Sequence, residues 1–195
     1  MMSSNFSSES EQYDGTEIVT IRDDDGRCLD CYVENEVDYE GKNYVLLMPI
    51  DLTIMILTDD VLDEEEDSDI ETVIVEDDDE IDAIFDDAKA VLAELNLSLK
   101  RSGFLLTASG ELPPLEDDNL VSLELDEDNG QIVGEELQFL AIFYSFEQKY
   151  SIFTPTTPIM FLGERKSSGK IIIFEPENEK QQAILEELLF ESDED

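Results

Sequence analysis

Two cysteines stand three residues apart, at Cys28 and Cys31, which is the spacing of redox and zinc-binding motifs. The residues around them, 27–33, have the pattern of a β-strand, on which residues three apart point to opposite faces about 10 Å apart. A disulfide needs Cα atoms within about 7 Å. A zinc site needs two further ligands, and the chain has no histidine and no third cysteine. We therefore expect two free thiols that serve the fold, with no cofactor and no metal.

Acidic turns that end in glycine, at 23–26 and 126–130, look at first like calcium-binding loops. An EF-hand loop requires oxygen ligands at fixed positions, from the first residue to a glutamate at the twelfth. Aligned on Gly26, the first position holds Ile21 and the twelfth holds Tyr32; aligned on Gly130, the first position holds Leu125. Hairpin turns between strands explain both segments better. Weak binding of divalent cations by their carboxylates stays open.

Few catalytic arrangements are available to this chain. The absence of histidine excludes Ser–His and Cys–His arrangements and histidine metal ligands. The sequence has no glycine-rich phosphate loop and no G-x-S-x-G motif. With 52 acidic residues, neighbouring carboxylates are guaranteed and say nothing about acid–base catalysis. A non-catalytic protein is the preferred interpretation, and an enzyme that uses carboxylates, with or without a divalent metal, is the alternative.

The net charge is the dominant property of the composition, since 52 Asp and Glu against 11 Lys and Arg give −41. Such a field repels phosphate backbones and anionic membranes and attracts basic proteins. We expect a partner protein with a basic surface, no direct nucleic-acid binding and no membrane insertion, and we leave the oligomeric state open. Solubility alone is a competing explanation of the charge, and mimicry of a nucleic acid is a further alternative function.

Length and hydropathy indicate a folded protein of the cytoplasm. The 195 residues, 41% of them hydrophobic, are enough for a packed core. The N-terminal residues lack the basic and apolar regions of a signal peptide. No apolar run reaches the roughly 18 residues that a membrane span needs.

The two halves of the chain show the same order of strand and helix patterns. In the first half, β-branched and apolar runs predict strands at 18–21, 27–33, 44–48, 53–57 and 73–75. A helical spacing of apolar residues follows from Ile81 to Leu95. In the second half, strands are predicted at 120–125, 138–144, 150–155, 159–162 and 171–175, and a helix at 178–190.

This order predicts an α+β fold: two tandem copies of a small antiparallel β-meander, each closed by one amphipathic helix. The first copy spans 16–112 and includes an acidic loop at 59–69 and a trailing hairpin at 97–109. A linker at 113–118 leads to the second copy at 119–190. Residues 1–15 are expected to form a disordered N-terminal tail, and 191–195 an acidic tail.

The copies differ in one loop, and this difference supplies the candidate interaction residues. Where the first copy has the acidic loop, the second has 163–170, the basic cluster of the sequence. A plain hairpin turn explains the cluster, and the functional alternatives are a clasp onto the acidic loop or a separate contact point. The candidates are Asp63, Glu64, Glu65 and Glu66 in the acidic loop and Arg165, Lys166 and Lys170 in the basic cluster.

Several of these motifs resemble known families. The segment from Ile18 to Leu57, with its D-D-G turn, E-G-K-x-Y segment and M-P-I-D run, is similar to a short acidic bacterial domain of unknown function. With G-F-L-L-T-A-S-G-E-L-P at 103–113 and T-P-T-T-P at 154–158, most of 17–190 resembles an uncharacterised family of cyanobacteria and plastids, domain of unknown function 3727. The resemblance implies a photosynthetic-lineage cytoplasm, or the stroma in a plastid. It brings no established active site, so no residue role is carried over.

Taken together, the sequence predicts a non-catalytic acidic interaction module, an adaptor or assembly factor that docks on a basic partner surface. The charge steers basic partners at long range. The absence of histidine and cofactor motifs leaves little for catalysis. Strand edges of the predicted meanders could pair with a segment of the partner.

Overall fold

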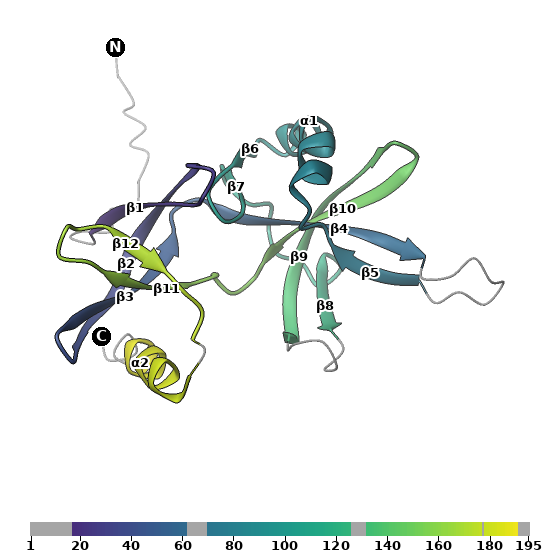
Figure 1. Cartoon of the computed structure of the whole chain (residues 1–195). Coiled ribbons are helices and arrows are strands. Elements are labelled where there is room, and N and C mark those ends of the chain that lie inside the picture. The colour runs from purple at the N-terminus through teal and green to yellow at the C-terminus, as the bar shows by residue number, and fades with distance from the viewer. Residues whose placement is uncertain (1–16, 62–69, 126–131, 177, 191–195) are drawn as a thin grey trace, which may run out of the picture.

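The computed structural model describes residues 17–61, 70–125, 132–176 and 178–190 (Figure 1). Within these ranges the chain is mostly antiparallel β-structure with two helices, so the predicted α+β class is confirmed. The strands of the first half are β1 (Ile18–Arg22), β2 (Cys28–Tyr39), β3 (Lys42–Pro49), β4 (Leu52–Val61), β5 (Ile70–Ile74), β6 (Ser98–Arg101) and β7 (Leu106–Ser109). Those of the second half are β8 (Leu120–Leu125), β9 (Ile132–Ser145), β10 (Gln148–Pro155), β11 (Phe161–Arg165) and β12 (Ile171–Ile173).

The helices are α1 (Asp78–Glu94) and α2 (Glu179–Phe190), close to their predicted positions. Helix α1 begins where Asp77 caps it, because the Asp77 side chain accepts a hydrogen bond from the Glu80 N–H at 2.9 Å. Its buried side chains recur at helical spacing, as the sequence predicted: Ile81, Ile84, Ala88 and Leu92.

Hairpins form where the chain can adopt positive φ. Gly26, at φ +81°, closes the turn between β1 and β2, so the acidic segment 23–26 is the predicted hairpin turn. The β2–β3 turn has Glu40 and Gly41 at φ +50° and +77°, and the β9–β10 turn has Phe146 and Glu147 at +50° and +67°. Both match the two-residue turn in which each central residue has positive φ.

The strands form two sheets, and each sheet contains strands from both halves of the chain. One has five strands in the order β1-β2-β3-β11-β12. The other is curled and has seven, in the order β6-β7-β4-β10-β9-β8 with β5 paired to β4. The exchange is reciprocal: β3 pairs with β11, and β10 pairs with β4, all antiparallel.

The prediction of two tandem units, each closed by one helix, is not confirmed, because both sheets combine strands of the two halves. Helix α1 packs on β9 of the second half and on β6 of its own half, and α2 packs on the β2–β3 hairpin of the first half (Figure 1). The order of elements that suggested a duplication is present in both halves, but neither half closes on its own strands. Common ancestry of the halves stays a prediction.

The reason for the exchange lies in the connections after β3 and β10. Only Ile50 and Asp51 separate β3 from β4, and neither has the positive φ that a two-residue hairpin requires. Strand β10 ends at a proline, Pro155, as β3 ends at Pro49. The segment 156–160 that follows β10 also has no residue with positive φ. The chain therefore makes no tight hairpin at either point and passes through bends at 50–51 and 156–157 from one sheet into the other.

Four apolar clusters hold this arrangement together. The largest lies between α1 and the seven-stranded sheet and includes Ile84, Leu92 and Ile152. The five-stranded sheet is apolar on both faces, one centred on Val45 and Leu47 and the other covered by α2. A fourth cluster, defined by Leu57, Leu137 and Phe153 with Met55, Ile74 and Phe139, contains no residue of either helix.

Boundaries differ from the predictions in several strands, by six residues at the end of β2, which extends to Tyr39. Strand β4 extends to Val61 because it pairs with β5, so Asp59 and Asp60 belong to a strand instead of the acidic loop. Strand β9 begins at Ile132, six residues before its predicted start. The remainder of the acidic loop, 62–69, and the turn 126–130 lie outside the described residues.

Candidate functional site

The candidate interaction residues fall into two groups. Asp63, Glu64, Glu65 and Glu66 lie outside the described residues, so the structure does not place them. Arg165, the last residue of β11, binds both carboxylate oxygens of Glu17, at 2.9 and 2.8 Å. Lys166 lies 2.5 Å from Glu164, and the Lys170 carbonyl accepts from the Lys166 N–H at 2.8 Å to close the β11–β12 turn.

The basic cluster is therefore largely neutralised by carboxylates of its own sheet. Lys42 also binds Glu164, at 3.1 Å, and hydrogen bonds from the two lysines hold the pKa of that carboxyl below its usual range. Among the described residues, eight of the eleven Lys and Arg pair with an Asp or Glu in this way: Arg27, Lys42, Lys100, Arg101, Lys149, Arg165, Lys166 and Lys180. What the molecule presents to a partner is thus mainly negative charge.

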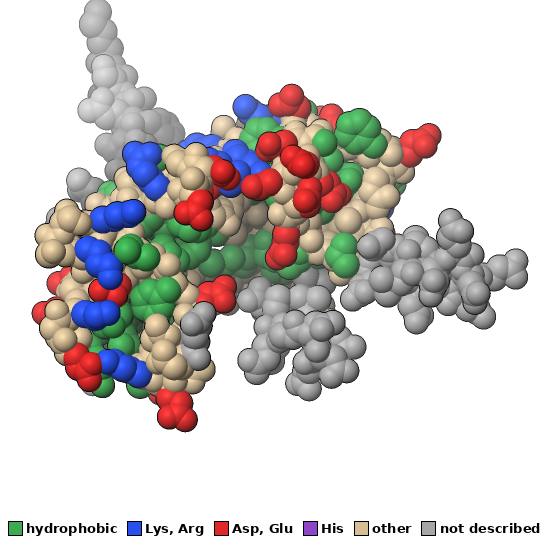
Figure 2. Space-filling model, viewed as in Figure 1, with side chains coloured by type: hydrophobic (Ala, Val, Ile, Leu, Met, Phe, Trp, Pro, Cys, Tyr) green, Lys and Arg blue, Asp and Glu red, His purple; other side chains and the backbone are tan. Residues whose placement is uncertain are grey.

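Among the described residues, α1 carries a row of exposed aspartates. The exposed aspartates of this helix are Asp78, Asp79, Asp82, Asp86 and Asp87, here called the acidic ridge. Figure 2 shows Asp and Glu side chains gathered over α1, with Lys and Arg side chains beside them. Among the described residues, ion pairs reach the ridge only from Arg27 and Arg101, at Asp78 and Asp82.

Beside the first turn of α1 lies a central hollow of about 440 Å³ between the two sheets. Apolar side chains of β4, β5 and β7 line it, together with Ile81 of α1. Its polar lining comes from the β1–β2 turn, the start of α1 and the β6–β7 hairpin: Asp23, Arg27, Glu76, Asp78, Arg101 and Ser102.

Two arginines from distant parts of the chain meet in this hollow. Arg27 lies 2.6 Å from Asp23 and 3.4 Å from Asp78, and Arg101 binds Asp78 as well and lies 3.2 Å from Asp82. The Arg27 hydrogen bond, supported by the charge of Arg101, lowers the pKa of Asp78. This network joins the β1–β2 hairpin of one sheet to α1 and β6 of the other.

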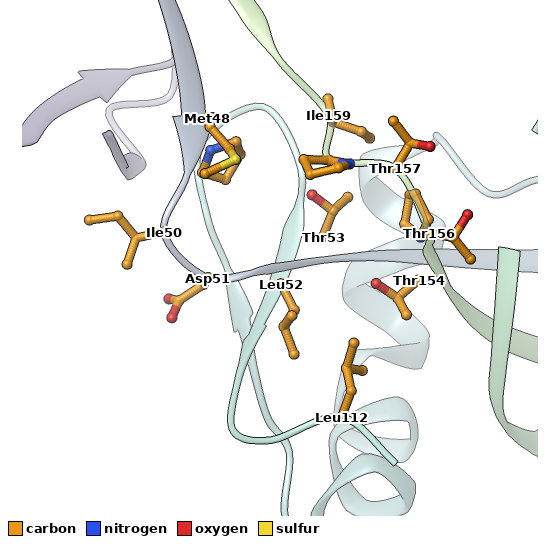
Figure 3. Close-up of a pocket in the computed structure, with 13 residues that line it drawn as sticks. Met48, Ile50, Asp51, Leu52, Thr53, Leu112, Thr154, Thr156, Thr157 and Ile159 are labelled. Atoms are coloured by element: carbon orange, nitrogen blue, oxygen red, sulfur yellow. The ribbon is translucent and has the colours of Figure 1, made fainter. Parts of the chain in front are cut away.

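A smaller hollow of about 240 Å³ lies where the chain crosses between the sheets (Figure 3). The β3–β4 connection forms one side of it and the β10–β11 connection the other, and it shares Thr53 and Ile159 with the central hollow. Its lining is mostly threonine, proline and aliphatic side chains, and its one carboxylate, Asp51, binds Lys100 at 2.7 Å. This hollow can accept a small apolar group and brings together no nucleophile and base.

The cysteines lie on β2 as predicted. Cys28 is exposed and Cys31 is buried, and neither is in a disulfide. Arg22 donates to the Cys28 sulfur at 2.7 Å, and burial raises the pKa of Cys31 to about 12. Among the residues that the structure describes, no three Cys, Asp or Glu side chains are placed to hold a metal ion.

Sequence reasoning missed the Arg27–Asp78–Arg101 network and the exposed end of β9. A weak signal for the arginines was available, because cations are scarce in this chain and each is a candidate for a specific contact. The second feature is carried by Ile142, Tyr144 and Phe146, and the predicted strand at 138–144 did not indicate which of its faces is exposed. None of the helices in the described ranges is long and apolar enough to cross a membrane.

Comparison with known proteins divides the chain near the end of α1. Residues 24–93 match a family model described as protein of unknown function DUF1292, and 96–192 match one described as protein of unknown function DUF3727. No curated protein and no solved structure matches the chain. The resemblance to two domains of unknown function is confirmed as matches to these two family models, and the DUF3727 match covers 96–192 instead of most of 17–190.

Proposed function

We propose that the protein is a non-catalytic interaction module, an adaptor or assembly factor, that docks with an acidic surface on a basic surface of a partner protein. The acidic ridge of α1 is the observation that carries this proposal. Its five aspartates lie within three helical turns and are exposed.

The ridge is partly unfavourable for the helix that bears it. Like charges at i, i+4, as in Asp82–Asp86, destabilise a helix by roughly 0.2–0.5 kcal/mol a pair. The repulsion between Asp78 and Asp82 is offset by Arg101, which pairs with both. The last turn of α1 has no basic residue that would favour the helix dipole. Stability accounts for Asp78 and Asp79, which lie in the first turn and favour the helix dipole, but not for Asp86 and Asp87. Recognition of a basic surface accounts for the whole row, since a dense row of like charges accelerates encounter with opposite charge.

The same electrostatics limits the class of partner. Phosphate backbones and anionic membranes are repelled by the ridge, so the proposed partner is a protein. The cytoplasm, or the stroma if the protein belongs to a plastid, is the proposed location.

A pair of charge-matched variants tests the proposal. The ridge variant carries Asp79→Asn, Asp86→Asn and Asp87→Asn, which spare the aspartates paired with Arg27 and Arg101. The control variant carries Glu116→Gln, Asp117→Asn and Asp118→Asn, three exposed acids of the segment between β7 and β8. Both change the net charge by the same amount.

Each protein is immobilised and exposed to native lysate at low salt, and bound proteins are eluted with a salt gradient. We expect one dominant basic partner to be retained by the wild type and by the control variant and to be lost from the ridge variant. Retention that ignores salt, or equal loss from both variants, would contradict docking through the ridge.

A further inference from the structure

The end of β9 presents apolar side chains to solvent. Ile142, Tyr144 and Phe146 are 45%, 70% and 79% exposed, whereas Phe143 and Ser145 between them are buried. A strand with one face in water normally places polar residues on that face. From Leu137 to Phe146 the sequence has no charged residue, so the outward face lacks the charges that usually protect an exposed strand.

Phe146 also occupies an unfavourable backbone conformation. Both central residues of its turn have positive φ, which glycine and asparagine accept and a bulky side chain resists, at a cost of roughly 1–2 kcal/mol. The corresponding β2–β3 turn has glycine, Gly41, at its second position. Because the Phe146 ring is mostly exposed, packing within the molecule does not offset this cost.

Ile142, Tyr144 and Phe146 form an apolar stripe, and the backbone of β9 beside this stripe is available for pairing with another strand. Strand β8 pairs with β9 only as far as Gln138, and among the described residues no strand pairs with that edge of β9 from Leu140 to Ser145. The register places Ile142 and Tyr144 on the same face as Leu57 and Phe153, which belong to the cluster that neither helix covers. Ser151 and Lys149 of β10, which pair with Ile142 and Tyr144, separate these side chains from the cluster, and the cluster itself is buried. The exposed apolar side chains of β9 therefore form a separate patch at the free edge and at the tip of the hairpin.

We propose that the outer edge of β9 and the β9–β10 tip, here called the β9 edge, bind an extended segment of a basic partner protein by strand addition. The partner's backbone would pair with residues 140–145, and its apolar side chains at alternate positions would contact Ile142, Tyr144 and Phe146. This inference rests on the proposed interaction function and names a second surface for it, apart from the acidic ridge.

Charge favours a basic partner over a second copy of this chain as the occupant of the β9 edge. Pairing two copies edge to edge would bring together two molecules of net charge −41. A partner segment that alternates apolar and basic residues avoids this repulsion. Its apolar side chains would contact the stripe, and its basic side chains would be attracted by the net negative charge of this protein. Among the described residues, one ion pair lies on the strands next to Ile142 and Tyr144: Lys149 of β10 lies 3.6 Å from Asp59 of β4.

The test uses the full chain and two labelled peptides of one composition. The first is an eight-residue peptide that alternates lysine and valine; the second has four lysines followed by four valines. Fluorescence anisotropy measures both affinities at low salt, and hydrogen exchange locates the bound peptide. The variants are Phe146→Asn and Tyr144→Thr at the β9 edge, the ridge variant described above, and Glu40→Asn in the matching turn as control.

We expect the alternating peptide to bind about tenfold more tightly than the block peptide, as one well-placed aromatic anchor can provide, and to protect amides 140–145. Phe146→Asn and Tyr144→Thr should remove that difference, and Glu40→Asn should preserve it. Phe146→Asn should raise the melting temperature by about 2–4 °C, since asparagine tolerates positive φ. Glu40→Asn gains the same tolerance but loses the ion pair with Lys180, so its melting temperature should change less. Loss of stability in Phe146→Asn would assign the ring a structural role and overturn the inference.

The two proposals fail in different ways. If both peptides bind the wild type equally and the ridge variant weakens both, the acidic ridge stands and the β9 edge does not. If neither peptide binds, both proposals are wrong. Dimers of the wild type in sedimentation that disappear in Phe146→Asn would show that the occupant is a second copy, which also overturns a basic partner.

Discussion

At the scale of single residues, the two cysteines show how burial separates chemically identical groups. Cys28 is exposed near Arg22, whereas Cys31 lies in the apolar cluster with Val45 and Leu47. The buried thiol stays protonated because ionisation in an apolar surrounding is costly, and its pKa rises to about 12.

Thiol titration should therefore distinguish them. At pH 8, one equivalent of Ellman's reagent should react rapidly, at Cys28, and the second only after denaturation, because the thiolate is the reactive form. Cys28→Ser should abolish the fast phase, and Cys31→Ala should leave it. Two fast equivalents in the native protein would show that Cys31 is not buried as described.

The same shift predicts alkaline instability. Burial raises the pKa of Cys31 to about 12 in the folded state, whereas the pKa of an unfolded thiol stays near its ordinary value of 9.0. This contribution to stability is complete below pH 9 and is lost as the pH rises toward 12. The melting temperature should fall over this interval, and Cys31→Ala should reduce the slope in thermal scans from pH 8 to 11.

At the scale of elements, the β6–β7 loop holds one sheet against the other through a close backbone contact. The Gly103 N–H donates to the Cys28 carbonyl at 3.1 Å, and a Cβ at Gly103 would lie 2.7 Å from the Arg27 carbonyl oxygen. Only glycine permits this approach, and it also fixes the backbone that presents Arg27 to Asp78.

Gly103→Ala should consequently destabilise the protein by about 1–3 kcal/mol, as overpacking does elsewhere. Gly169→Asn is the matched control, because Gly169 has φ +82° with open space around it and asparagine tolerates that conformation. Urea unfolding followed by circular dichroism measures both. A Gly103→Ala variant as stable as the control would mean that the loop moves freely away from β2.

At the scale of the whole molecule, the exchange of strands joins the two halves into one folding unit. Each sheet has at its centre a strand pair from opposite halves, β3 with β11 and β4 with β10. Unfolding of one half would leave the other with an open edge and an uncovered apolar face. Neither half is therefore expected to persist without the other.

Calorimetry should show a single transition with equal calorimetric and van't Hoff enthalpies. Its midpoint should rise between 10 and 150 mM NaCl. Salt weakens repulsion among 52 acids more than it weakens exposed ion pairs, each worth about 0–1 kcal/mol. Two resolved transitions would contradict the joint unfolding of the halves, and a midpoint that is flat or falls with salt would indicate carboxylates already neutralised by cations.

Local patterns in the sequence were enough to predict the local structure. The helical spacing from Ile81 to Leu95 located α1, the D-D-G and E-G turns located two hairpins, and the alternation around Cys28 and Cys31 placed them on opposite faces. Acidity and the absence of histidine were properties of composition and needed no fold. Each of these signals depends on residues within a few positions of one another.

Only the tertiary structure decided which strands pair and what remains exposed. The pairing of β3 with β11 and of β10 with β4 joins residues more than 90 positions apart, and no local periodicity encodes it. The meeting of Arg27 and Arg101 at Asp78 and the exposure of Phe146 follow from that pairing. A strand's sequence shows that it has an apolar face, but the packing of the whole chain determines whether anything covers that face.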